Sequence, residues 1–188
     1  MRWSRSTRCI RTRGKKGQKH GDPDDPPRRR ANKVKGHGTW DNDRPPVFGI
    51  VGRESKQIRL DVLPRSTRKQ LEPAVLEATR PGATVNTDEW QAYNHLPRHG
   101  RPRRSVNHNP RAPEWARDDD GDGVREVHIN TMEGIWTGLR NFLRPFRGVN
   151  KAYLAQYVAI FQWGHNIPTC TDEFLQALLG SQPTTAGT

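Results

Sequence analysis

Two β-branched, apolar segments separated by a short polar turn place the strongest constraint on the fold. Residues 47–52 read VFGIVG and residues 58–63 read IRLDVL, with the polar residues 53–56 between them. Two such runs joined by a polar turn are typical of a β-hairpin. The chain is therefore predicted to build its core on a sheet that begins at Pro46.

The residues after this hairpin predict one helix and two short strands. Ser66 or Thr67 can cap a helix whose apolar residues recur at helical spacing until Pro81. A short strand is predicted at 83–87, and a further short strand is predicted at 104–108.

Two more helices are predicted in the C-terminal half. One carries an apolar stripe at i, i+4, i+7 and i+11, formed by Met132, Trp136, Leu139 and Leu143. It is expected to end near 145–148, and a last helix is expected over about 151–166. Trp136 and Trp163 are interpreted as core residues. The order of elements predicts an α/β layer with helices packed on a small mixed sheet.

The first part of the chain has a different character. Residues 1–45 contain few apolar side chains, an acidic and proline-rich cluster at 22–27, and the basic triplet Arg28, Arg29 and Arg30. A segment of this kind buries too little surface to offset its ordering entropy, so 1–45 is expected to be an extended or disordered arm.

The charge of the chain favours a polyanionic partner. Lys and Arg outnumber Asp and Glu by 32 to 20, which gives a net charge of +12. Nucleic acid is the first candidate for such a partner. Cys9 and Cys170 lack the spacing of a zinc ribbon or a disulfide framework, which fits a reducing cytoplasm. No apolar run approaches the ~20 residues that span a bilayer, so no membrane partner is expected.

Two carboxylates are placed where they could share a metal ion. Asp88 follows the strand at 83–87, and Glu133 lies in the first turns of an amphipathic helix. Carboxylate oxygens suit magnesium, and paired divalent ions support phosphodiester chemistry. The structural alternatives are a turn residue at Asp88 and a carboxylate that complements the helix dipole at Glu133. The acidic cluster at 118–122 is interpreted as a solvated loop.

Several basic side chains are candidates for contact with a DNA backbone. They are Arg28, Arg29, Arg30, Arg140, Arg144, His108 and His128. Arg140 lies two helical turns after Glu133 on roughly the same face, and Arg144 lies one turn further. The alternatives are a solvated helix face for the two arginines and partly buried histidines bonded to backbone carbonyls.

In order and spacing, five segments together carry a family resemblance. They lie at 86–93, 106–108, 127–136, 147–149 and 161–166. From about Gly14 to Asn166 the chain resembles bacterial insertion-sequence DDE transposases of the ISXO2-like type. The resemblance implies an RNase H-like mixed sheet with flanking helices over 46–168, followed by a tail at 169–188. It also implies a Mg²⁺ or Mn²⁺ site of two aspartates and a glutamate, DNA cleavage followed by strand transfer, and a homo-oligomer on DNA.

In the resemblance, Asp88 matches the family's second catalytic carboxylate and Glu133 matches its third. The first belongs to an opening strand with an Asp-Glu-x-Tyr pattern, which this chain lacks. Codons compatible with residues 3–12, read from the third base, can encode Val-Glu-Val-Asp-Glu-Val-Tyr-Gln-Asn, with the aspartate over Ser6 and Thr7. We therefore hypothesise that a frame shift replaced the first strand.

The expected function is that of a transposase-derived protein with impaired catalysis. Asp41 and Asp43 were weighed as substitutes for the missing carboxylate, but they precede a Pro-Pro turn. The alternatives are a non-catalytic DNA-binding protein or repressor of transposition, and a product that never folds because its first strand is missing. The protein is expected in the cytoplasm, associated with the nucleoid.

Overall fold

A mixed sheet lies at the centre of the computed structural model, which describes residues 2–5, 8–9, 38–107, 114–167, 169 and 171–179. Its strands are β1 (Arg2–Arg5), β2 (Arg8–Cys9), β3 (Pro46–Gly52), β4 (Ile58–Val62), β5 (Thr84–Asp88) and β6 (Arg103–Val106). They follow the order β2-β3-β1-β5-β6, and β4 pairs with the other edge of β3. The predicted hairpin is therefore confirmed as β3 and β4.

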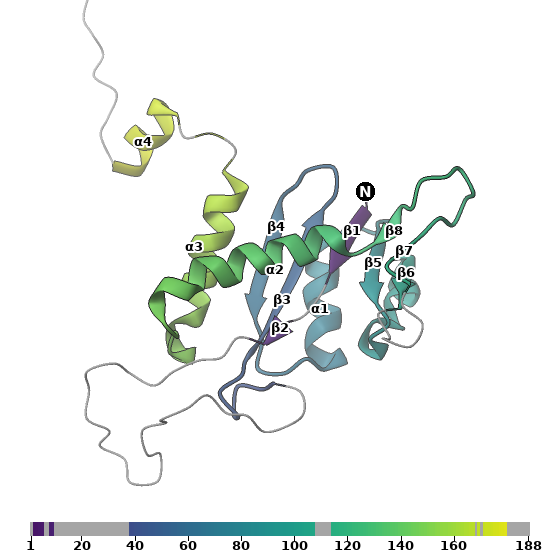
Figure 1. Ribbon diagram of the computed structural model, residues 1–188, viewed down its shortest axis with the longest axis horizontal. Helices are drawn as coiled ribbons and strands as arrows, with labels where there is room; N and C mark the ends of the chain where they lie inside the picture. Colours follow the sequence, from purple (N-terminus) through teal and green to yellow (C-terminus); the bar gives the residue numbers. More distant parts are fainter. Residues whose placement is uncertain are drawn as a thin grey trace, which may run out of the picture.

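Helices cover both faces of this sheet (Figure 1). They are α1 (Arg68–Ala78), α2 (Asn130–Leu143) and α3 (Lys151–Asn166), while α4 (Asp172–Leu179) lies beyond the end of α3, away from the sheet. Short 3-10 turns lie at Gln91–Tyr93 (η1), Leu96–His99 (η2) and Arg144–Phe146 (η3), and β7 (Ala116–Arg117) pairs with β8 (Val127–His128). The predicted helix at 151–166 is confirmed, whereas α4 was not predicted within the 169–188 tail.

The first strand is present in the sheet. β1 pairs antiparallel with β3, with Ser4 opposite Val51, and parallel with β5, with Ser4 opposite Asn86. The first strand was expected to be missing or replaced, and residues 2–5 with the sequence RWSR occupy its place between β3 and β5. Backbone pairing explains this, because a ladder satisfies N–H and C=O groups whatever the side chains are.

Within 1–45, the described strands β1 and β2 join the sheet. Both strands pair with β3 in one register, with Arg5 opposite Ile50 and Arg8 opposite Val47. Residues 38–45 also join the body, since the Trp40 N–H donates to the Pro64 carbonyl oxygen at 2.8 Å. Residues 10–37 lie outside the described part of the chain.

Alternation along β3 produces two apolar clusters, one on each face of the sheet. Val47 and Val51 pack with α2 and α3, in a cluster that includes the buried Trp136. Phe48 and Ile50 face the other way and pack with α1. Figure 1 shows α2 crossing one face while α1 lies on the opposite one.

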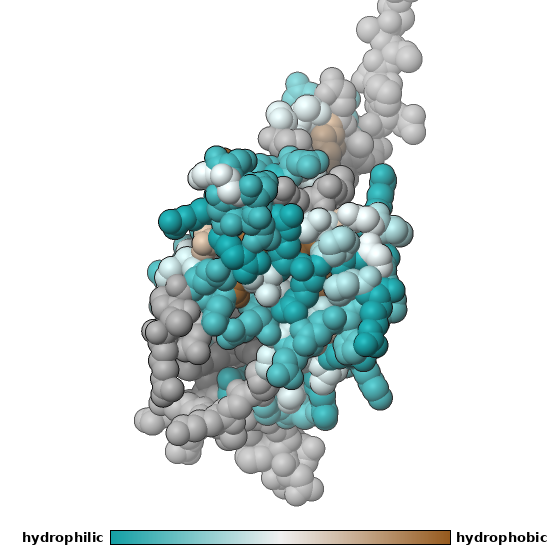
Figure 2. All heavy atoms as spheres, turned by 90° about the vertical axis from the view of Figure 1, so that its right-hand side faces the viewer, coloured by the Kyte–Doolittle hydropathy of each residue, from teal (hydrophilic) through white to brown (hydrophobic). Residues whose placement is uncertain are grey.

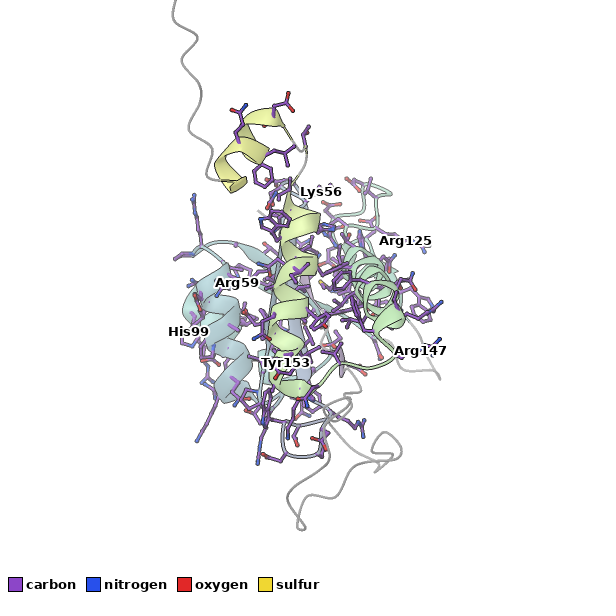
Figure 3. The ribbon with its side chains drawn as sticks, turned by 90° about the vertical axis from the view of Figure 1, so that its left-hand side faces the viewer. Lys56, Arg59, His99, Arg125, Arg147 and Tyr153 are labelled. Atoms are coloured by element: carbon purple, nitrogen blue, oxygen red, sulfur yellow. The ribbon has the colours of Figure 1, made fainter. Side chains whose placement is uncertain are left out.

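α3 packs against β4 and carries a partly exposed apolar surface. Figure 3 shows it in front of the sheet, between α1 and α2. Leu154 and Val158 are buried, but Trp163 is 51% exposed, so its interpretation as a core residue is wrong. Its ring instead contacts Phe174 of α4. Within the described residues, we find no helix with the length and apolarity needed to cross a membrane.

Candidate functional site

Asp88 lies at the C-terminal end of β5, on the sheet face that α2 covers. Val85 belongs to the cluster on the α1 side, so alternation places Asn86 and Asp88 on the α2 side. The Asn86 side chain confirms this direction, because its Nδ2 donates to the carbonyl oxygen of Glu126 at 3.3 Å, just before β8.

Glu133 lies on α2 in the first turn, above the same face of the sheet. Met132 and Trp136, on either side of it in the sequence, are buried against β3. α2 also contacts β1, and β1 is hydrogen-bonded to β5. Asp88 and Glu133 therefore belong to two elements, β5 and α2, that both contact β1, and both residues lie on the same face of the sheet.

A small apolar cluster connects the end of β5 to the start of α2. Val106 of β6 is aligned with Asp88 in the parallel ladder. It packs with Val127 and with Ile129, the residue immediately before α2. The packing of Val106 thus brings the first turn of α2 toward the strand end that carries Asp88.

The immediate contacts of Asp88 come from the backbone and from a buried arginine. Its Oδ1 accepts the backbone N–H of Trp90 at 3.2 Å, as in a turn after a strand. Arg103 donates to the Asp88 carbonyl oxygen at 2.9 Å and to Thr87 Oγ1 at 2.9 Å. Burial lowers the pKa of Arg103, and the Asp88 charge partly opposes that shift.

No acidic residue occurs in the described residues of β1, the strand that contacts both β5 and α2. β1 reads Arg-Trp-Ser-Arg, and the first acid of the whole chain is Asp22. The proposed substitutes are engaged elsewhere: Asp43 pairs with Lys151 at 3.0 Å and Asp41 pairs with Arg65 at 2.9 Å. The described residues of β1 therefore add no carboxylate to those of Asp88 and Glu133.

Arg53 is a residue of this region that sequence reasoning missed. It follows β3, and its guanidinium donates to the carbonyl oxygens of Glu126 and, at 2.6 Å, of His128. These bonds hold the segment that leads into α2 against the sheet. Only the long-range fold brings Arg53 to residues more than 70 positions away, so no local signal could have identified it.

His128 lies on β8 and is partly buried. Burial lowers its pKa, and the positive charge of Arg53 lowers it further. The imidazole is thus held in its neutral form near pH 7, which makes it a poor ligand for phosphate. This environment favours the alternative of a structural histidine.

The remaining candidates for DNA contact have different positions. Arg140 and Arg144 are exposed at the C-terminal half of α2 and the start of η3, and Arg140 donates to Thr137 Oγ1 at 2.8 Å. His108 and the triplet Arg28, Arg29 and Arg30 lie outside the described residues.

A second group of acids lies in the β7–β8 connection. Ligand oxygens of Asp118, Asp120 and Glu126 lie within 4.8 Å of one another. Glu126 is only 8% exposed and pairs with Arg104 at 2.6 Å, while Asp118 accepts N–H groups of its own loop. Residues 118–122 thus form the largely exposed loop that the sequence predicts, and the pair of Glu126 with Arg104 lies at its base. Figure 2 shows this side of the molecule as largely hydrophilic.

The fold belongs to the RNase H-like class. A chain in the structure of the simian T-cell lymphotropic virus intasome with the PP2A regulatory subunit B56 gamma superposes with a TM-score of 0.50, at 13% identity, covering 99% of this chain and 56% of that chain. This likeness concerns the fold alone.

The sequence defines the family within that class. The model of the ISXO2-like transposase domain matches residues 16–166, and the chain belongs to this family. An uncharacterised protein in the transposable element ISH50 of Halobacterium salinarum (strain ATCC 700922 / JCM 11081 / NRC-1) is 30% identical over 149 residues, or 79% of this chain. The chain spans about half of that relative, 48% of its length.

Proposed function

We propose that this chain derives from a transposase that cleaves and joins DNA at insertion-sequence ends, and that its own catalysis is impaired. The observation that carries the proposal is the placement of Asp88 and Glu133 on one sheet face, flanking a first strand without a carboxylate. The protein would act in the cytoplasm on nucleoid DNA, as a homo-oligomer on paired ends.

Two carboxylates fit a divalent site only in part. A bound Mg²⁺ or Mn²⁺ supplies charge neutralisation and an activated oxygen for in-line displacement at phosphorus. Asp88 and Glu133 would hold one ion, each from a half-buried position at the end or start of its element. Without a third carboxylate between them a second ion binds poorly, so the step that needs both ions is slow.

The frame-shift hypothesis identifies where a carboxylate would restore the site. In the shifted reading frame, the codon for the family's first aspartate overlaps the codons of Ser6 and Thr7. One of these two positions would therefore carry the restoring carboxylate.

The experiment is a cleavage and strand-transfer assay with the full chain, on DNA from the ends of its own element, in Mg²⁺ or Mn²⁺. We expect negligible product from the wild type. Ser6→Asp or Thr7→Asp should raise the rate by on the order of 100-fold. Robust strand transfer by the wild type would contradict impairment, and wild-type rates in both variants would contradict the proposed position.

The nucleotide sequence tests the origin of the first strand. The family match begins at residue 16, which supports a return to the family's reading frame near that position. Codons for residues 3–12 that cannot encode the Val-Glu-Val-Asp-Glu-Val-Tyr-Gln-Asn peptide in the shifted frame would rule out the frame shift.

A second candidate function is DNA binding without catalysis, as a repressor of an intact transposase. The net charge of +12 and the exposed Arg140 and Arg144 favour it. Its test compares the salt dependence of DNA binding for the wild type and for a double variant, Asp88→Ala with Glu133→Ala. Unchanged binding with no cleavage by either protein supports this candidate, and wild-type cleavage that the double variant loses contradicts it.

A further inference from the structure

A cavity of about 380 Å³ lies between the start of α1 and the turn that follows β5. Its wall combines the segment around Arg65 and Arg68 at the start of α1 with Trp90 and Gln91 after β5, and Thr39 closes one side. We propose that this cavity binds one unpaired DNA nucleotide, with its base against the Trp90 indole and its phosphate near the two arginines. The proposal rests on the proposed function for its choice of DNA as the partner.

Two hydrogen bonds hold Trp90 in place, one from its backbone and one from its indole ring. Its backbone N–H donates to Asp88 Oδ1 at 3.2 Å, and its Nε1–H donates to the carbonyl oxygen of Ser66 at 3.3 Å. The second bond ties the ring to the segment before α1, across the cavity. The residue nevertheless stays 37% exposed, so the ring presents surface to a ligand. Stacking on an exposed aromatic ring is a common way to bind bases without regard to sequence.

The charge of the wall suits a phosphate. Among the described residues that line the cavity, Arg65 and Arg68 are charged and none is acidic. Arg65 pairs with Asp41 and Arg68 pairs with Glu72, and both arginine side chains are about half exposed. Surface ion pairs of this kind contribute little to stability. A phosphate can therefore replace the carboxylate partner of either guanidinium.

The size of the cavity selects a single nucleotide over a duplex. Its volume lies at the lower end of the roughly 300–1,000 Å³ of pockets that hold small molecules. A base can enter only after leaving the stack, which costs least where the DNA is already single-stranded.

The test measures binding to a duplex with three unpaired thymidines at its 3′ end, against the same duplex with a blunt end. Fluorescence anisotropy in EDTA gives both dissociation constants without cleavage. We expect the wild type to prefer the extended duplex and Trp90→Ala to lose about tenfold of that preference. Trp90→Phe should retain most of it. The matched control Trp115→Ala, at a residue 60% exposed outside the cavity, should retain all of it.

A second measurement uses only the wild-type protein. Replacing the three thymidines by abasic nucleotides keeps the phosphates and removes the bases, so the preference should fall as it does for Trp90→Ala. Equal binding of extended and blunt duplexes by the wild type, or full preference in Trp90→Ala, would overturn the proposal. Absence of cleavage in Mg²⁺ would bear on the proposed function alone, because these assays contain no metal.

Discussion

At the scale of single residues, His128 on β8 makes the stability of the protein depend on pH. Its folded-state pKa is lowered, first by burial and then by Arg53, so protonation is disfavoured in the folded protein. The unfolded chain then binds more protons as the pH falls through about 6.5, and stability is lost over that fall. We expect His128→Gln to flatten the decline in urea midpoint between pH 7.5 and 5.5. Identical declines in the variant and the wild type would contradict this.

Two acidic groups compete as metal sites, and single substitutions separate them. Glu126 is already paired with Arg104 at 2.6 Å, so a metal ion in the β7–β8 loop would have to compete with that guanidinium for its carboxylate. We expect weak Mn²⁺ binding by calorimetry that Glu133→Gln reduces at least about tenfold, since one charged ligand is lost. The control Asp120→Asn should leave the affinity unchanged, and the reverse result would move the site to the β7–β8 loop.

At the scale of elements, Gly49 sets how closely α2 approaches β3. A Cβ atom at this position would lie 2.6 Å from Met132 Cε and 2.8 Å from Trp136 Cη2. We therefore expect Gly49→Val to destabilise the protein by about 1–3 kcal/mol in urea denaturation, because overpacking a filled core forces its neighbours apart.

Gly134 in α2 provides the matched control for that substitution. A Cβ there meets no described atom within 4 Å. Gly134→Ala should stabilise the protein by up to about 1 kcal/mol, since alanine is the better helix former. Unchanged stability in Gly49→Val would contradict the close approach of α2 to β3 at this position.

The link between the β3–β4 turn and α2 depends on Arg53. Arg53→Met removes the donors to the carbonyl oxygens of Glu126 and His128, and each unsatisfied buried group costs about 1–3 kcal/mol. We expect faster amide exchange at the start of α2 together with lower stability. Arg59→Met is the control, because Arg59 makes exposed ion pairs and its loss should change little.

At the scale of the whole molecule, β1 joins the two halves of the sheet. It is the strand that lies between β3 and β5. Its backbone hydrogen bonds therefore join the β3–β4 half of the sheet to the β5–β6 half. Ser4→Pro removes one ladder N–H and should cost about 3 kcal/mol, lowering the midpoint of a cooperative melt. Ser4→Ala retains the backbone groups and should melt near the wild type. A wild type without a cooperative transition would instead support a product that does not fold.

Much of the architecture could be predicted because it depends on local patterns. Alternating β-branched residues predicted the β3–β4 hairpin, and the stripe from Met132 to Leu143 predicted α2. α4 was missed, because its eight residues were taken as part of a tail. β1 was missed because Arg-Trp-Ser-Arg has no apolar period.

The sequence by itself determined the family and predicted Asp88 and Glu133 as its second and third carboxylates, since these depend on residue types and spacing. Only the tertiary structure decided that a basic tetrapeptide occupies the central place in the sheet, because backbone pairing is indifferent to side chains. It also decided the contacts of Arg53 and the cavity beside Trp90, since both join segments distant in sequence. Long-range packing, which local patterns do not encode, assembles these features.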